Sequence, residues 1–455
     1  MERFVSVTPW NGAPFATWGP LDAAGVDAAL QAGAAAAADW AAVPVAARAA
    51  ALDGLAAALR AAAPVLAAQI VAEVGKPIGE AVAEVEKCAL VCAWYAAEGP
   101  ALLAPVALRG GPRAVTLRRD PAGLVLSIMP WNFPFWQVFR VLAPAVLAGD
   151  ALRVKHAPST QGCMAALAAV AARALPPGLV DGLRAPLPLL PAALAHPAVA
   201  RVTFTGSTPA GRAVAAQAGA ALKRTVLELG GSDAFVVLAD ADPAAAARAA
   251  AASRCINAGQ SCIAAKRFVV EATVAPAFTE ALHAALAAFV PGDPRDPATR
   301  LGPLHRADLR ATLHAQVQAS RAAGARLLLG GEVPEGPGFF YPPTLLLGPP
   351  DGCPAADDEL FGPVASVFVV PDAEAAIARA NRSPYALAAS VWSGDPARAA
   401  ALAPRLRAGS LFVNAAPASE PGVPFGGRGD SGHGRELGAA GLDELVELRA
   451  LTVVS

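Results

Sequence analysis

Short runs of β-forming residues alternate with longer runs rich in Ala and Leu over most of the chain. The first alternation begins after Gly123, where residues 124–129 precede residues 136–148, and a second begins near Ala234. The order strand, helix, strand, helix is the signature of parallel sheets with helical crossovers. The further runs in this pattern are 151–154 with 161–175, 201–204 with 209–221, 235–238 with 243–255, and 268–270 with 277–289.

The two alternations predict an α/β protein with two large lobes. A chain of 455 residues is too long for a single hydrophobic core. Residues 22–98 show the apolar spacing of helices, with apolar side chains recurring every three and four positions. The strand-like segments 115–118 and 451–454 lie outside both alternations.

Composition and charge exclude several classes of protein. With 55% hydrophobic and 16% charged residues the chain is globular, and a net charge of −1 without a long basic run argues against a nucleic-acid partner. The N-terminus lacks the pattern of a secretory signal. The uncharged stretch 121–139 contains Pro130 and Pro134, which favour a strand running into a loop over a membrane span.

The six cysteines show no CxxC pair and no disulfide framework, which indicates a reducing, cytoplasmic location. Cys88 and Cys92 have the i, i+4 spacing of helical metal ligands. However, no His or acidic partner completes a site nearby, so we expect both to pack in the core and expect no metal site.

The stretch NAGQSCIAAK at residues 257–266 places one thiol, Cys262, in a small polar loop ahead of an apolar run. Free cysteine is most often buried as a small hydrophobe, so packing is one interpretation. Gly259 and Gln260 favour the other, a loop that presents the side chain.

Four further segments have the residues of special turns. Residues 201–212 predict a strand, a Gly206-Ser207 turn and a helix opened by Thr208 and Pro209, whose first backbone N–H groups suit a pyrophosphate. Each turn alone is weak evidence, because a bare strand-to-helix turn is often only structural. The others are residues 130–134, which hold Asn132 between two prolines, residues 226–233, which include Glu228, and residues 358–364, which include Glu359.

Taken together and in order, these segments resemble the motif set of the aldehyde dehydrogenase superfamily. The resemblance covers nearly the whole chain. Within the superfamily, residues 155–158 and 227–233 are most similar to the bacterial succinate-semialdehyde dehydrogenases of the shorter, Sad-like type. The motifs that carry the resemblance lie at 130–134, 204–211, 228–231, 259–262, 359–364, 424–427 and 431–436.

The resemblance implies a Rossmann-like cofactor domain, a second α/β catalytic domain and a small β oligomerisation element. It also implies a homodimer or homotetramer. The expected cofactor domain comprises residues 1–104 and 121–231, the catalytic domain residues 232–425, and the oligomerisation strands residues 105–120 and 440–455.

The chemistry implied by the resemblance uses three side chains. Cys262 would add to an aldehyde, since the aldehyde carbon cannot release hydride until a nucleophile has added. Asn132, with the Cys262 backbone N–H, would stabilise the oxyanion. After hydride transfer a thioester would remain on Cys262, and Glu228 would activate the water that hydrolyses it and could also serve the thiol.

The same resemblance predicts NAD or NADP as cofactor. Lys155 and Glu359 would hold the two riboses. Pro158 stands where NAD-preferring relatives often carry a glutamate that repels a 2′-phosphate, so neither cofactor is excluded, and Ser159 or Thr160 could receive that phosphate. The cofactor-binding residues expected in full are Trp131, Asn132, Lys155, His156, Ala157, Pro158, Gly206, Ser207, Leu229, Glu359 and Phe361.

For the substrate, the resemblance points to succinate semialdehyde. Arg140 matches a position that holds a distal carboxylate, and Ser419 lies in the loop that closes the pocket. Some relatives carry a second arginine six residues before the cysteine, where this chain has Ile256. A structural Arg140, paired with a helix neighbour, is the alternative.

Three rival functions remain open. One is a broad-specificity aldehyde dehydrogenase, and another is a non-catalytic relative, against which the joint presence of Cys262, Glu228 and Asn132 argues. The third is a Cys–His hydrolase, which would leave the cofactor turn and Glu228 unexplained. Its base would be one of His156, His196, His283, His305, His314 or His433.

Overall fold

The first lobe is built on a six-stranded sheet in the order β19-β9-β8-β5-β6-β7. The computed structural model describes residues 3–109 and 113–454. All neighbours in this sheet are parallel except β19 and β9. The chain order reverses between β5 and β8, and ligands of such sheets bind in the crevice outside the carboxyl ends of the strands at that point. The strands are β5 (Leu124–Met129), β6 (Ala151–His156), β7 (Val180–Gly182), β8 (Val199–Thr205), β9 (Arg224–Glu228) and β19 (Gly432–His433).

Helices cover the first sheet, and α4 is the most deeply buried of them. Every residue of α4 is buried, and apart from Gln137 and Arg140 its side chains are apolar on all sides. One helix, α2, is long and apolar enough to span a membrane by length and composition alone. It packs against α3, α4 and α5 as a core helix of this lobe. The helices are α1 (Ala23–Ala41), α2 (Val45–Val74), α3 (Ile78–Leu102), α4 (Trp136–Ala148), α5 (Gln161–Ala171), α6 (Leu190–Ala195), α7 (Thr208–Ala220) and α14 (Gly438–Asp443).

The second lobe contains a seven-stranded sheet in the order β12-β13-β14-β11-β10-β16-β17. Its neighbours are parallel except β12 and β13. Separate hydrophobic clusters lie around it. Its strands are β10 (Ala234–Val237), β11 (Arg267–Glu271), β12 (Arg326–Leu329), β13 (Thr344–Leu347), β14 (Val364–Val370), β16 (Ala388–Trp392) and β17 (Ser410–Val413). Its helices are α8 (Pro243–Cys255), α9 (Ala275–Ala287), α10 (Ala307–Ala322), α11 (Pro354–Asp357), α12 (Ala373–Ala380) and α13 (Pro396–Leu402).

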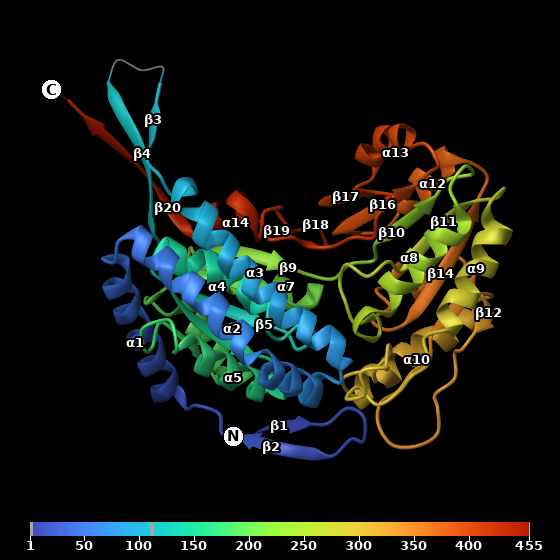
Figure 1. The fold of residues 1–455 in the computed structure, drawn as a ribbon, viewed down its shortest axis with the longest axis horizontal. Helices are drawn as coiled ribbons and strands as arrows, with labels where there is room; N and C mark the ends of the chain where they lie inside the picture. The colour runs from blue at the N-terminus through green and yellow to red at the C-terminus, as the bar shows by residue number, and fades with distance from the viewer. Residues whose placement is uncertain (1–2, 110–112, 455) are drawn as a thin grey trace.

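A three-stranded arm projects from the first lobe (Figure 1). It joins β3 (Val106–Leu108), β4 (Ala114–Pro121) and β20 (Val446–Val453), with Thr116 opposite Leu451. The prediction that segments 115–118 and 451–454 are strand-like and lie outside both large sheets is therefore confirmed as far as Val453. The expected ranges 105–120 and 440–455 also contain residues 110–112 and 455, which lie outside the described residues.

The C-terminal part of the chain returns from the second lobe to the first. Short strands β15 (Tyr385–Ala386) and β18 (Arg428–Gly429) pair on the way, and β19 then adds to the first sheet beside β9. Phe425 and Glu436 form an isolated antiparallel bridge in this segment. The return places residues 419–436 beside the end of β9, which carries Glu228.

The alternation predicted from the sequence is confirmed, with three elements at the predicted residues: β5, α4 and α8. The helix predicted over residues 161–175 is shorter in the structure, where α5 ends at Ala171. Pro176 and Pro177 follow closely, and residues before proline disfavour helical backbone. The N-terminal hairpin of β1 (Phe4–Val7) and β2 (Pro14–Trp18) was not predicted. The proposed domain boundaries stay a prediction.

Candidate active site

The loop that carries Cys262 has strained backbone. After α8, the 3₁₀ turn Ile256–Gly259 holds Asn257 at φ 48° and Ala258 at φ 52°, both in the left-handed region, and Gly259 follows at φ 76°. Such non-glycine conformations persist only where the surroundings enforce them. Here Asn257 Nδ2 donates to the Asn132 carbonyl at 2.7 Å, and the Asn257 N–H donates to Glu80 at 2.8 Å.

A buried lysine holds the other side of this loop. Lys266 Nζ donates to the carbonyls of Ser261 and Cys262 at 2.9 and 2.8 Å, and it lies 3.4 Å from Glu359 Oε1. Gly231 lies below, where a Cβ would come within 2.5 Å of the Cys262 carbonyl oxygen. Sequence reasoning missed Lys266, although a lysine that ends a loop before an apolar strand is a usable signal.

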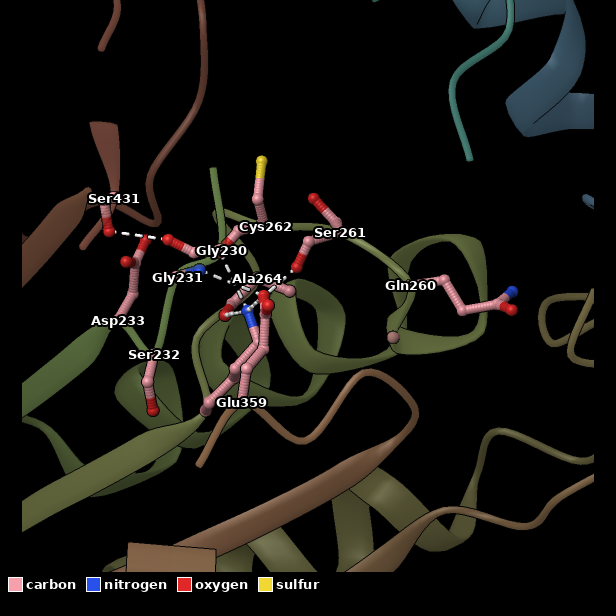
Figure 2. A network of polar contacts seen from close by, with 12 residues as sticks. Gly230, Gly231, Ser232, Asp233, Gln260, Ser261, Cys262, Ala264, Glu359 and Ser431 are labelled. Atoms are coloured by element: carbon pink, nitrogen blue, oxygen red, sulfur yellow. Dashed lines mark hydrogen bonds and ion pairs between the residues drawn. The ribbon is translucent and has the colours of Figure 1, made fainter. Parts of the chain in front are cut away.

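Cys262 Sγ points away from this network (Figure 2). Cys262 lines two cavities, one of about 330 Å³ and one of about 270 Å³. Burial raises the pKa of the thiol to about 12, although Arg140 and Lys266 favour the thiolate. In this arrangement Cys262 is protonated at neutral pH, so activation needs a base or a change in the pocket.

Asn132 lies next to Cys262 and has a fixed orientation. It follows β5 and lines the smaller cavity together with Cys262. Its Oδ1 accepts from Gln137 Nε2 at 3.0 Å, and its Nδ2 donates to the Gln260 carbonyl at 3.0 Å. One N–H of the amide remains for a ligand. Gln137, which lies in the first turn of α4, was not singled out from the sequence.

Glu228 is close to the site but lines neither cavity. It ends β9, is buried, and both its oxygens lack a hydrogen-bond partner among the described residues. Burial raises the pKa of its carboxyl well above the usual range, and the neighbouring Glu436 raises it further. Burial therefore favours the protonated form of Glu228, whereas the proposed water activation requires the carboxylate form.

Arg140 forms a buried ion pair with Glu436. Arg140 Nε lies 2.6 Å from Glu436 Oε2, and the guanidinium stacks on Phe425 with its carbon 4.8 Å from the ring centre. Nε and Nη2 nevertheless lack well-directed hydrogen bonds among the described residues. Arg140 also lines the larger cavity with Ser419, so its guanidinium can contact a ligand there while it pairs with Glu436. The pairing of Arg140 with Glu436 was not predicted from the sequence, because the position of Glu436 depends on the returning C-terminal segment.

Six of the predicted cofactor residues besides Asn132 line the smaller cavity. At the start of α7, Ser207 makes no side-chain cap, so the first helical N–H groups are available to an anion. Gly206 also has a packing role, because a Cβ there would come within 2.6 Å of the Phe204 ring. The six residues are Trp131, Gly206, Ser207, Leu229, Glu359 and Phe361.

Of the predicted residues, Lys155 and His156 end β6 and Ala157 and Pro158 follow it, and none of the four lines this cavity. Both ring nitrogens of His156 are occupied, since Nδ1 accepts from the Ala157 N–H at 3.0 Å and Nε2 lies 2.8 Å from the Pro134 carbonyl. Burial lowers the pKa of His156 to about 4. Its side chain is therefore structural, and a cofactor contact at 156 is restricted to the backbone.

The two hydroxyls considered for a 2′-phosphate already have protein partners. Ser159 Oγ lies 2.7 Å from His305 Nε2, and Thr160 Oγ1 lies 2.6 Å from His156 Nδ1. His305 in turn stacks on Trp131, with 4.2 Å between ring centres. Lys155 is buried close by, and burial lowers the pKa of its ammonium.

Within the described residues, no histidine lines either cavity at Cys262. A Cys–His hydrolase would need a histidine beside Cys262 as its base, and the described residues place none there. The described residues also contain no group of three or more His, Cys, Asp or Glu side chains placed to hold a metal. Cys88 and Cys92 lie fully buried in the core of the first lobe.

Comparison with known proteins identifies the family. The family model for the aldehyde dehydrogenase family matches residues 1–451. The chain belongs to the aldehyde dehydrogenase family.

Several relatives and solved structures of aldehyde dehydrogenases are similar over nearly the whole chain. The succinate semialdehyde dehydrogenase [NAD(P)+] Sad of Escherichia coli is 45% identical over 98% of this chain and 95% of its own. A probable succinate-semialdehyde dehydrogenase [NADP(+)] of Synechocystis is 43% identical over 85% of this chain and 86% of its own. The structure of succinic semialdehyde dehydrogenase from Streptococcus pyogenes in complex with NADP+ superposes with a TM-score of 0.97, at 31% identity, over 99% of this chain and 100% of its own.

Proposed function

We propose that this aldehyde dehydrogenase oxidises succinate semialdehyde to succinate with NAD or NADP. The observation that carries the proposal is the position of Cys262 where two cavities meet. One is lined by glycine turns and a helix start, and the other by Arg140, Ser419 and apolar side chains. The names of the similar proteins support the same substrate and cofactors.

The residues of the smaller cavity fit a nicotinamide dinucleotide. Uncapped N–H groups at the start of α7 suit the pyrophosphate, and Glu359 offers a carboxylate to a ribose. When bound, the nicotinamide supplies the hydride acceptor. Lys155 and residues 156–158 stay proposed contacts of the adenosine half.

In the proposed reaction the Cys262 thiolate adds to the aldehyde carbon. The carbonyl electron pair moves to oxygen, where the remaining Asn132 N–H and the Cys262 backbone N–H would stabilise the negative charge. Loss of hydride leaves a thioester on Cys262. Glu228 would then accept a proton from the water that attacks the thioester, which releases succinate and restores the thiol.

A kinetic comparison tests the proposal. Succinate semialdehyde and butanal have the same number of carbons, but only the first carries a carboxylate. With purified protein and each cofactor, the absorbance of reduced cofactor gives kcat/KM for both aldehydes. We expect a clear preference for succinate semialdehyde. Equal efficiency on both would instead identify a broad-specificity enzyme, which the apolar side chains Phe133, Trp136 and Phe425 of the cavity would also suit.

We further propose that the arm of β3, β4 and β20 mediates a homodimer or homotetramer. Apolar side chains are exposed along it, and an uncovered strand edge of this kind readily pairs with another copy. They are Val106, Leu108, Leu448, Leu451 and Val453. The proposed cytoplasmic location is supported by the cysteines, all six of which are unpaired and five buried.

A further inference from the structure

Two positive side chains, Lys87 and Arg140, line the larger cavity at Cys262, and no carboxylate among the described residues lines it. The proposed function assigns a task to one of them, Arg140. Lys87 lies in the middle of α3, is partly buried, and has no part in the chemistry described so far.

The two positive side chains differ in whether a nearby carboxylate of the protein neutralises their charge. Arg140 has Glu436 at 2.6 Å. Lys87 has no carboxylate within 4.0 Å among residues 3–109 and 113–454. Its nearest acidic neighbour on α3, Glu84, is committed elsewhere, since it pairs with Lys76 and accepts from the N–H groups of Phe135 and Trp136.

The contacts that Lys87 does make fix its ammonium at the cavity. Nζ donates to Ser419 Oγ at 2.9 Å and lies 4.4 Å from the centre of the Trp136 ring. A lysine ammonium has three N–H donors, so donors remain for a ligand. A buried cation without a counter-ion is costly, and a bound anion would relieve that cost.

The hydroxyl of Ser419 also lacks one hydrogen-bond partner among the described residues. Its Oγ accepts from Lys87 Nζ at 2.9 Å and from Trp136 Nε1 at 3.1 Å. Two donors occupy the acceptor side of the hydroxyl, which leaves its own O–H to donate. No acceptor for that proton occurs among the described residues, and a carboxylate oxygen in the cavity would supply one.

We propose that Lys87, with Ser419 held beside it, is the principal anchor for the distal carboxylate of the aldehyde substrate. Arg140 then contributes a second, partly neutralised positive charge. This inference rests on the proposed function, because it names the residue that distinguishes an ω-carboxylated aldehyde from a plain aliphatic one.

The test compares Lys87→Met with Lys87→Arg in the full-length protein. Lys87→Met keeps the length of the side chain and removes its charge, while Lys87→Arg keeps the charge. We expect the ratio of kcat/KM for succinate semialdehyde to that for butanal to fall roughly ten- to a hundredfold in Lys87→Met, mainly through KM. Lys87→Arg should retain most of the ratio.

The wild-type protein offers an independent test through pH. Burial and the nearby positive charge of Arg140 together lower the pKa of Lys87 to about 8. Cys88 and Glu84 on α3 and Glu420 beside Ser419 also face it and favour its charged form. The charge is present below that pKa and lost above it, so the selectivity ratio should fall between about pH 7 and about pH 9.5. Titration of Cys262 acts on both aldehydes and cancels in the ratio, and Lys87→Met should show no such fall.

The outcomes separate this inference from the proposed function. A wild type that prefers succinate semialdehyde, with the preference intact in Lys87→Met, overturns the inference and leaves the function standing. A wild type without the preference overturns both. If Lys87→Met does not fold, a selectivity ratio in the wild type that stays constant over this pH range still contradicts the inference.

Discussion

The two cavities that meet at Cys262 are built in different ways. The smaller is formed by turns at the carboxyl ends of β5, β8 and β9 together with the segment 359–361. The larger is formed by the loop 261–264 together with side chains from α3, α4, α8 and the segments 416–419 and 425. The first therefore consists of short local motifs, whereas the second combines the Cys262 loop with side chains from distant segments. The turns carry the residues proposed for the chemistry, whereas the residues proposed for substrate selectivity come together only in the folded chain.

The largest expected effect is at Cys262, the residue that both cavities share. Cys262→Ala should abolish aldehyde oxidation, because no other thiol lines either cavity among the described residues. Cofactor binding, measured by calorimetry, should persist, since the thiol does not build the α7 turn. Comparable turnover in the purified variant would contradict the covalent mechanism.

The next effect tests Glu228, which lies beside the site but outside both cavities. Glu228→Gln should acylate and then deacylate slowly, with a steady-state rate lower by about 10² to 10⁴. Stopped-flow absorbance should show a burst of reduced cofactor before the slow phase. Absence of the burst would move the role of Glu228 to activation of the thiol.

Arg140 belongs to the larger cavity and to a buried ion pair, and the two roles can be separated. Arg140→Leu should lower kcat/KM on succinate semialdehyde more than on butanal, by roughly tenfold and less than Lys87→Met does, because a charge-assisted contact is worth about 1.5 to 3 kcal/mol and Glu436 partly neutralises this one. Equal losses on both aldehydes would mean that Arg140 only supports the fold.

A control variant isolates the structural part of that loss. Arg140→Leu leaves Glu436 buried without its partner, and breaking a buried pair costs about 3 to 5 kcal/mol of unfolding free energy. Adding Glu436→Gln should recover part of this stability in urea unfolding without restoring selectivity. Recovery of selectivity in the double variant would show that the charge of Glu436, and not the loss of Arg140, disturbed the cavity.

The smallest effect on catalysis is expected at the arm, which lies outside both cavities. Deleting residues 451–455 removes exposed apolar positions of β20 and should lower the assembly state. Light scattering measures the change in size. An unchanged size would show that the arm does not hold the subunits together.

The features of this protein that depend on neighbours along the chain could be predicted from its amino-acid sequence. Alternating strand and helix periods predicted β5, α4, α8 and both large sheets, because hydrophobic periodicity is a local property. The loop of Cys262 and the turns at Asn132, Gly206 and Glu359 were likewise visible as short motifs. The structure places these turns around one cavity, as the parallel order of β5, β8 and β9 requires.

The pKa shifts at the site and the charge of the larger cavity follow from contacts between segments that are far apart along the chain. Glu436 reaches Arg140 and Glu228 because the C-terminal segment returns to the edge of the first sheet, far from both in sequence. Lys87 looks like an ordinary helical lysine until Ser419, which lies 332 positions away, is brought to it. Burial and Coulomb interactions depend on distance in space, and a single sequence does not contain those distances.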